Sequence, residues 1–345
     1  MEGSDMKRAV LDKPNALKVV DSDAPGPGPG EALVKVMRCG VCGSDIHSYT
    51  GRHPLTVYPV TPGHEFSGIV TEVGDRVDRA LEGARVCVEP SLTCGRCPQC
   101  LSGRYNICGE LKVMGFQAPG AFCELIAVPA EKVHLLPGGV GFDAGALAEP
   151  LAVGVHALRR SGAGRGDSAL IIGAGVIGLM VLTAARASGI DALVAEPDAA
   201  RADTARALGA TRVFPGGRHS SELISAVSEA GVGFVFECVG LARTADMAVR
   251  LAPRGSTLVV AGVFPGPVPV PLDLVQDGEL DIRGTLMYMA EDFELALGLL
   301  GDGLVDTEAL ITHSVPLEQL ERGYNIAIER RPPTLKVMVR VGEEA

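Results

Sequence analysis

The sequence lacks any run of Lys and Arg long enough to form a basic stripe. Its formal net charge is −11, because 42 Asp and Glu outnumber 31 Lys and Arg. A phosphate backbone is itself anionic, so this balance argues against nucleic acid as a partner. The N-terminal residues also lack an apolar segment followed by a small-residue cleavage site, so the sequence predicts no secretory signal. We therefore expect a cytoplasmic protein with reduced thiols.

Long uncharged segments are also scarce, and one of them has the length of a bilayer span. Residues 168–185 carry no charge, but three glycines, at 173, 175 and 178, interrupt this segment. A spanning helix of about 20 apolar residues is one reading. A buried parallel strand that leads into a buried helix gives the same composition and accommodates the glycines. We favour the second reading and expect no membrane partner.

The chain has 345 residues, which exceeds the size at which one hydrophobic core usually stops growing, so we expect two domains. Up to about residue 150, short β-branched runs such as 32–37 and 68–73 alternate with Gly and Pro turns, which predicts a mostly-β domain. After Leu151, apolar strands such as 169–172 alternate with Ala-rich helices such as 178–188. This alternation predicts βαβ units and a parallel sheet, hence the α/β class. No internal repeat is visible.

A glycine motif, GAGVIG at 173–178, follows the first apolar strand of the second domain and opens a helix. Gly173 allows the tight turn, Gly175 lets the backbone approach a pyrophosphate, and Gly178 lets the helix pack on the strand. The free N–H groups at the helix start, around Val176 and Ile177, then meet the phosphates. The motif predicts a dinucleotide site, and a tight strand-to-helix turn without a ligand is the alternative.

An acidic residue stands at the end of the next strand, at the distance from the glycines where a carboxylate accepts hydrogen bonds from the adenosine ribose. This residue is Glu196. Because a carboxylate there repels a 2′-phosphate, the sequence favours NAD over NADP. Arg201 follows in the next helix, where a contact at the ribose and a place on the solvated helix face both remain open.

Four cysteines lie close together with the spacing Cys-x2-Cys-x2-Cys-x7-Cys: Cys94, Cys97, Cys100 and Cys108. Four thiolates so spaced can surround one tetrahedral zinc, and a closed site of this kind is structural. Disulfides are less compatible with a reducing compartment and a large core. An iron–sulfur cluster also uses four cysteines, although the spacing differs from that of ferredoxins. We predict a structural zinc site.

A catalytic zinc needs three protein ligands and one open position. Cys42, in CGVCGSDIH, and His64, in PGHEF, are candidates for two of them. Taken alone, a single cysteine can equally be a small core residue, and a single histidine a hydrogen-bonded polar group. Their context in the rest of the chain favours the metal.

Five motifs occur in an order that resembles the zinc-dependent medium-chain alcohol and polyol dehydrogenases. They are GVCGSDIH at 40–47, PGHEFSG at 62–68, the four-cysteine segment, EPLAVG at 149–154 and GAGVIG at 173–178. The resemblance covers essentially the whole chain. It implies a GroES-like catalytic domain over 1–150 with a zinc lobe at about 90–110, a Rossmann NAD-binding domain over 151–290, and a segment over 291–345 that returns to the catalytic domain.

Within that superfamily the sequence is similar to the sorbitol, threonine and butanediol dehydrogenase branch, which has Glu-Pro where liver-type enzymes have a second cysteine ligand. The resemblance implies a catalytic zinc on Cys42 and His64, with Glu65 and Glu149 as acidic partners. Which carboxylate binds directly stays open, and Glu65 can act instead as an outer group that orients His64 or the metal.

The resemblance also assigns the residues around the metal. Ser44 and His47 correspond to the hydroxyl and imidazole that relay the alcohol proton, with an exposed loop residue as the alternative for His47. Val263 and Leu286 are implied as further cofactor contacts. The cofactors expected are two Zn²⁺ per chain, one catalytic and one structural, and NAD.

The substrate implied is a small-molecule secondary alcohol, oxidised to the ketone. Polyols, cyclitols or aminocyclitols, sugar acids, vicinal diols and, as an alternative, amino alcohols of the threonine type all remain open. Met287 and Ser48 depart from the animal sorbitol enzymes, which also lack the four-cysteine lobe, so a microbial type fits better. A non-catalytic zinc and NAD protein is a further alternative, and the family suggests a homotetramer or dimer.

Overall fold

The computed structural model describes residues 5–215, 220–329 and 334–343. The chain folds into two compact units. Unit 1 comprises the residues up to Glu149, residues 300–302 and the residues from Thr307 onward, and unit 2 comprises 150–299 and 303–306. Helix α4 (Ala148–Ser161) begins at the end of unit 1, so Glu149 in its first turn belongs to that unit.

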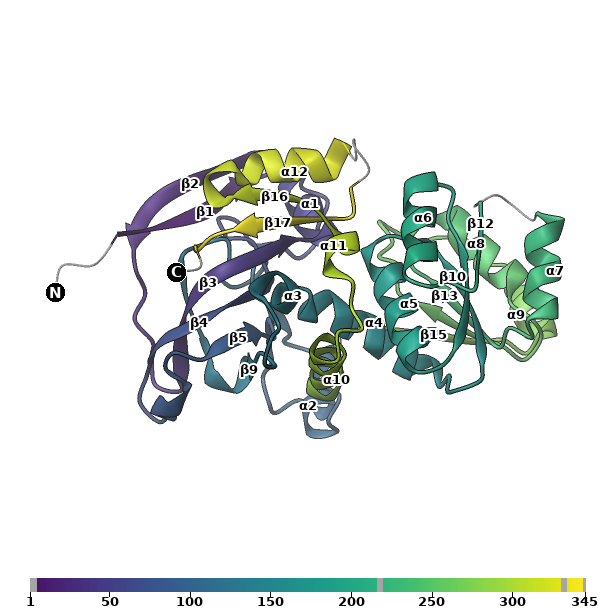
Figure 1. The fold of residues 1–345 in the computed structure, drawn as a ribbon, viewed down its shortest axis with the longest axis horizontal. Helices are drawn as coiled ribbons and strands as arrows, with labels where there is room; N and C mark the ends of the chain where they lie inside the picture. The colour runs from purple at the N-terminus through teal and green to yellow at the C-terminus, as the bar shows by residue number, and fades with distance from the viewer. Residues whose placement is uncertain (1–4, 216–219, 330–333, 344–345) are drawn as a thin grey trace. The chain divides into compact units, whose positions relative to one another are not determined.

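Unit 1 is built around a seven-stranded sheet with the order β16-β17-β3-β4-β5-β9, in which β8 also pairs with β3. The last strand of the chain, β17, lies antiparallel beside β3, so the C-terminal residues complete the sheet that the N-terminal residues begin (Figure 1). The strands of unit 1 are β1 (Asp5–Lys13), β2 (Ala16–Asp23), β3 (Glu31–Val41), β4 (Glu65–Val73), β5 (Arg85–Val88), β6 (Ser91–Leu92), β7 (Lys112–Val113), β8 (Leu125–Pro129), β9 (Val133–Leu135), β16 (Ile311–Pro316) and β17 (Lys336–Arg340).

Short helices cover and connect this sheet. They are α1 (Gly43–Tyr49), α2 (Pro98–Leu101), α3 (Phe142–Ala146), α11 (Thr307–Leu310) and α12 (Leu320–Glu329), with the 3-10 turns η1 (Arg79–Leu81), η2 (Tyr105–Ile107), η3 (Ala130–Lys132) and η4 (Leu317–Gln319). Tyr324 of α12 is fully buried and packs edge-on against Tyr49 of α1 and Phe122. The core therefore joins the N-terminal and C-terminal parts of the unit.

Unit 2 contains a six-stranded parallel sheet with the order β12-β11-β10-β13-β14-β15. Its strands are β10 (Ser168–Ile172), β11 (Asp191–Ala195), β12 (Arg212–Phe214), β13 (Phe234–Glu237), β14 (Thr257–Val260) and β15 (Asp281–Gly284). Its helices, besides α4, are α5 (Val176–Ala187), α6 (Ala199–Ala207), α7 (Ser221–Glu229), α8 (Ala242–Leu251), α9 (Leu272–Asp277) and α10 (Ala290–Gly301). The mixed α/β class expected from the sequence is confirmed.

The strand order reverses at β10, which pairs with β11 on one side and β13 on the other. Right-handed crossovers then place the helices on opposite faces of the sheet. Figure 1 shows α5 and α6 in front of the sheet and α8 behind it. In open α/β sheets, ligands bind outside the carboxyl ends of the strands at this switch point. The glycine motif follows β10 and therefore lies there.

The uncharged segment 168–185 forms β10 and most of α5. Residues 178–185 of α5 are buried, as expected for a helix covered on all sides within a domain. In the described part of the chain, no helix is long and apolar enough to cross a bilayer.

Candidate active site

Cys42 stands at the start of helix α1, where the chain leaves β3. It is the N-cap residue, and its backbone N–H donates to the Asp45 carboxylate at 2.9 Å. Asp45 is completely buried, whereas Cys42 is partly exposed. The carboxylate near the helix start stabilises the free N–H groups of the first turn. The helix start thus holds the Cys42 thiol in a fixed place.

His64 is brought beside this thiol by the turn before β4. Gly63 has φ +98°, and a Cβ there would collide with Phe122 and the Cys39 sulfur, so only glycine suits the turn. The His64 ring is 5% exposed, and its Nδ1 lies 3.5 Å from Asp45 Oδ1. Burial lowers the pKa of His64, and Asp45 and Cys42 raise it by more, so the pKa lies well above its ordinary value. The surroundings of His64 are therefore electronegative and suit a cation.

Glu65, the first residue of β4, points its carboxylate into the same region. One ligand atom from each of Cys42, His64 and Glu65 lies within 4.8 Å of the other two. A thiol, an imidazole and a carboxylate at such separations match the donor set that zinc takes in proteins. The second acid, Glu149, is 7% exposed and is not part of this close group among the described residues.

Lys336, the first residue of β17, is a site residue that the sequence did not reveal. Its Nζ lies 2.7 and 2.6 Å from the two Glu65 oxygens and 3.2 Å from the Val41 carbonyl oxygen. Burial lowers the pKa of Lys336, and Glu65 and Cys42 raise it by more, with Glu149 adding to the rise. The ammonium therefore stays charged beside the Glu65 carboxylate. The available signal was a lysine directly before the apolar run 337–339.

Ser44 and His47 lie three residues apart on α1, so their side chains share one face of the helix. Both are partly exposed. The loop after α1 folds back onto His47, whose carbonyl oxygen accepts from the N–H groups of Arg52 and His53 at 2.7 and 3.1 Å. This fixes the end of the helix that carries the two residues.

Two ring side chains that the sequence did not reveal, His53 and Phe116, lie beside the candidate metal ligand His64. The His53 ring stacks on Phe116 at 4.6 Å between centroids, and Phe116 lies 5.0 Å from the His64 ring. Burial, followed by the nearby His47 imidazole, lowers the pKa of His53. Neither residue belongs to a motif, so only the folded structure reveals them.

The four-cysteine segment folds around a compact cluster of sulfur atoms. The four sulfur atoms all lie within 4.8 Å of one another, and they belong to Cys94, Cys97, Cys100 and Cys108. Backbone N–H groups point at these atoms, including Cys100 N to Cys97 Sγ at 3.5 Å and Cys94 N to Cys108 Sγ at 3.4 Å. The N–H groups of Cys100 and Gly109 lower the pKa of Cys97 to about 6. Thiolates with N–H donors fit a structural zinc.

The glycine motif is organised by Glu196, the acid at the end of β11. One Glu196 oxygen accepts from the N–H of Ala174 at 2.7 Å, and the other accepts from the N–H of Asp198 at 2.9 Å. Gly175 is the N-cap of α5. The acid therefore lies directly against the loop where a dinucleotide's ribose and phosphates meet.

The remaining predicted cofactor residues occupy the same edge of the unit 2 sheet or its neighbouring helix. Val263 follows β14 and is 75% exposed, and Leu286 follows β15 and is 51% exposed. Arg201 lies in the first turn of α6, where its backbone N–H donates to Asp198 at 3.0 Å. The structure thus gathers these positions near the carboxyl ends of the strands.

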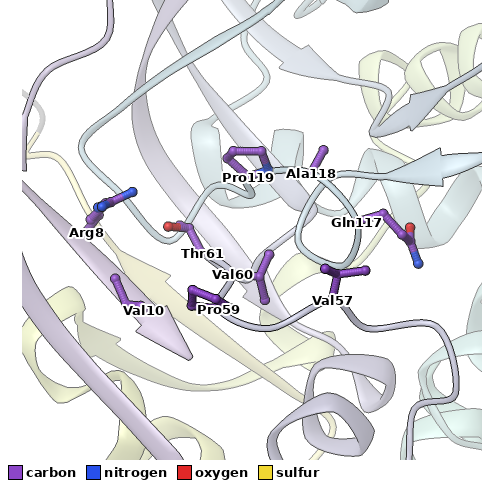
Figure 2. A pocket seen from close by; sticks show the side chains of 9 residues that line it. All are labelled: Arg8, Val10, Val57, Pro59, Val60, Thr61, Gln117, Ala118 and Pro119. Carbon is purple, nitrogen blue, oxygen red and sulfur yellow. The ribbon is translucent and has the colours of Figure 1, made fainter. Parts of the chain in front are cut away.

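A separate pocket of about 190 Å³ lies in unit 1 against β1. Figure 2 shows Arg8 and Val10 of β1 on one side, and Gln117 with its neighbours in the loop on the other. The Thr61 hydroxyl points toward Arg8 (Figure 2). None of the predicted metal ligands lines this pocket, so we do not assign it to the metal chemistry.

Two family models match the chain. Residues 28–138 match the alcohol dehydrogenase GroES-like domain, and residues 176–302 match the zinc-binding dehydrogenase family. Sorbitol dehydrogenase of Bacillus subtilis (strain 168) is 34% identical over 342 residues, with 97% of each chain covered. The chain belongs to the zinc-dependent medium-chain dehydrogenase/reductase superfamily. It falls in the sorbitol and butanediol dehydrogenase-like branch, and it is an oxidoreductase acting on CH–OH groups.

Other relatives of the enzyme agree with this placement. The 2-dehydro-3-deoxy-L-galactonate 5-dehydrogenase of Pseudoalteromonas atlantica is 34% identical, with 95% of this chain and 97% of the relative covered. Among solved structures, an alcohol dehydrogenase of Escherichia coli CFT073 complexed with NADH has a TM-score of 0.91 at 29% identity, covering 98% of this chain and all of that one. A zinc-binding dehydrogenase of Sinorhizobium meliloti 1021 bound to NADP has a TM-score of 0.88 at 32% identity. The match covers 98% of this chain and 100% of that one. The GroES-like and Rossmann-type domains are thereby confirmed.

Proposed function

We propose that this enzyme oxidises a secondary alcohol of a polyol, cyclitol, sugar acid or vicinal diol to the ketone, with NAD as hydride acceptor. The observation that carries the proposal is the close group of Cys42, His64 and Glu65 beside α1, because this donor set suits a catalytic zinc. The four-cysteine lobe would hold a second, structural zinc.

The residues of unit 1 have distinct tasks in this proposal. Cys42 and His64 hold the metal, and Asp45 fixes the orientation of the His64 ring through Nδ1. When bound, zinc supplies Lewis acidity that lowers the pKa of a coordinated alcohol. Ser44 and His47, on one face of α1, accept the alcohol proton and pass it toward solvent.

NAD is favoured over NADP by Glu196. Its carboxylate lies against the glycine loop and is 5% exposed, so an added 2′-phosphate would approach a buried negative charge. We therefore expect kcat/KM with NAD to exceed that with NADP by on the order of 10-fold or more.

The proposed substrate class is supported by the relatives named as sorbitol and 2-dehydro-3-deoxy-L-galactonate 5-dehydrogenases. Both names describe oxidation of a hydroxyl on a polyhydroxylated carbon chain. The partly exposed Ser44 and His47, together with the His53 and Phe116 rings, offer polar and flat surfaces beside the metal ligands. Such a mixed lining suits a substrate with several hydroxyl groups.

The test is an NAD-reduction screen over alditols, inositols, aminocyclitols, aldonic and uronic acids, vicinal diols and threonine, with zinc counted on the same sample. We expect NADH formation with a member of the polyhydroxylated classes and about two zinc ions per chain. Absence of turnover with every compound from a sample that holds both zinc ions would contradict the proposal. Turnover with threonine alone would replace the substrate class.

A further inference from the structure

We propose that the pocket of unit 1 against β1 is a second binding site, for a small carboxylate with a short apolar chain. The guanidinium of Arg8 binds the carboxylate, and the apolar side chains around it contact the chain of the ligand. None of the candidate metal ligands lines this pocket. No step of the proposed oxidation uses it, so the inference goes beyond the proposed function and does not depend on it.

Arg8 brings a positive charge to the pocket without an acidic partner of its own. Its Nε is buried and has no hydrogen-bond partner, and Arg8 forms no ion pair within the described part of the chain. Glu124 follows Cys123, the bridge partner of Arg8, but its carboxylate accepts from the backbone N–H of Lys7 at 2.7 Å. A buried donor without a partner is costly, and a guanidinium binds a carboxylate through paired N–H groups. An anionic ligand therefore completes the bonding of this arginine.

The size and lining of the pocket narrow the class of anion. Its volume of about 190 Å³ lies below the roughly 300 Å³ at which sites for drug-sized ligands begin. Thr61 is 6% exposed, and its hydroxyl points toward Arg8 as a second donor (Figure 2). Val10, Val57 and Pro59 are among the apolar residues around these two groups. Inorganic phosphate needs more donors than this to replace its hydration, whereas a carboxylate with a few carbon atoms matches both the donors and the apolar lining.

The walls of the pocket are held by hydrogen bonds that involve no ligand. Val60 exchanges backbone hydrogen bonds with Leu11 of β1 at 2.8 and 3.2 Å. The Gly120 N–H donates to the Thr61 carbonyl oxygen at 2.7 Å. The side-chain amide of Gln117 makes two hydrogen bonds to backbone groups of unit 1, at 2.8 and 2.7 Å. A pocket formed in advance costs little ordering of the protein when a ligand binds.

The test is a ligand-observed NMR titration of the full-length, zinc-loaded enzyme with butyrate. We expect a Kd on the order of 1 mM, because one ion pair and a short chain make few contacts. Butyramide has the same shape without the charge and should bind at least about 10-fold more weakly. Butyramide that binds as tightly as butyrate would overturn the proposal. Inorganic phosphate that binds more tightly than butyrate would also overturn it.

Two substitutions in the pocket test the donors. Arg8→Gln should weaken butyrate binding at least about 10-fold, because it removes the charge that binds the carboxylate. Thr61→Val removes only the hydroxyl and should weaken binding about 3- to 10-fold. Arg79→Gln is the matched control, because it removes the same charge from an exposed arginine of unit 1 and should leave the Kd unchanged. With folding checked by thermal unfolding and zinc content, a wild-type Kd in either pocket variant would refute the site.

Cys42→Ala separates this site from the catalytic metal, where a carboxylate can also bind. We expect this variant to lack the catalytic zinc and to keep the wild-type Kd for butyrate. Binding that is lost in Cys42→Ala and retained in Arg8→Gln would place butyrate at the metal and overturn the proposal. That result would leave the proposed oxidation intact, so the two failures are distinguishable.

Hydrogen exchange locates the bound ligand on the chain. Butyrate should slow the exchange of the Val57 and Gly120 amides, because both pair across the walls of the pocket. The Val57 N–H donates to the Phe116 carbonyl oxygen at 3.0 Å, as the Gly120 N–H does to that of Thr61. Protection by butyrate that is confined to other segments of the enzyme would contradict the pocket as the site.

Discussion

Among single residues, Cys42 differs from the other cysteines outside the lobe by its surroundings. Burial raises the pKa of Cys123 to about 12, and burial also raises the pKa of Cys87 and Cys238. Those thiols stay protonated and behave as small apolar residues. Cys42 is partly exposed at a helix start and lies beside His64. Position, rather than residue type, makes it the candidate metal ligand.

A substitution of the single residue His47 tests the proposed proton relay. We expect His47→Ala to reduce kcat on the order of 10²-fold near neutral pH, because a positioned base contributes that much to proton transfer. The loss should shrink as pH rises, since hydroxide and buffer then accept the proton. Steady-state rates across a pH series measure this effect. Zinc content must remain at the wild-type value, and a loss of zinc would assign His47 a metal-binding role instead.

At the scale of elements, the junction of β3, β4 and β17 holds Glu65 in the candidate metal site. Gly40→Ala places a Cβ where the Glu65 carboxylate lies. We expect a loss of about 1–3 kcal/mol in the free energy of unfolding, as for other overpacked core positions. Denaturant unfolding measures it. Gly26→Ala is the control, because nothing lies within 4 Å of a Cβ there; equal losses in the two variants would show that the site at β3 is not tightly packed.

The four-cysteine lobe makes a second prediction at this scale. Cys97→Ser should remove about one zinc per chain and lower Tm by several degrees, because a closed metal site contributes its binding energy to folding. Cys87→Ser, which alters a buried thiol outside the lobe, should keep the full zinc content. A Cys97 variant with unchanged zinc would contradict the structural site, as would equal zinc loss in the control.

Much of the arrangement of elements could be predicted from the sequence. The apolar runs at 169–172, 192–195 and 257–261 correspond to β10, β11 and β14, and the Ala-rich segments to α5 and α6. The strands and α5 are buried over most of their length, and α6 buries Ala202 and Ala205 on one face, so composition and period carry the signal. The short strands of the lobe, β6 and β7, have two residues each and no such pattern. Their positions depend on the cysteine cluster.

Across the whole molecule, the candidate site was predictable where its residues sit in motifs. Cys42 and His64 were candidates from their motifs, the family resemblance added Glu65, and the structure places the three together. Lys336 was missed because its partner Glu65 is 271 positions away, and pairing across a sheet leaves no local pattern. The ring of Phe116 was missed for the same reason. Long-range contacts of single residues require the fold.

The central claim, that the enzyme works through a metal held by Cys42 and separate from the lobe, is tested most directly by zinc counting with turnover on Cys42→Ala. We predict that wild type carries about two zinc ions per chain and that the variant keeps about one and loses NADH formation by at least on the order of 10³-fold. A Cys42→Ala protein that keeps both zinc ions, or that turns over its substrate at the wild-type rate, would contradict the account.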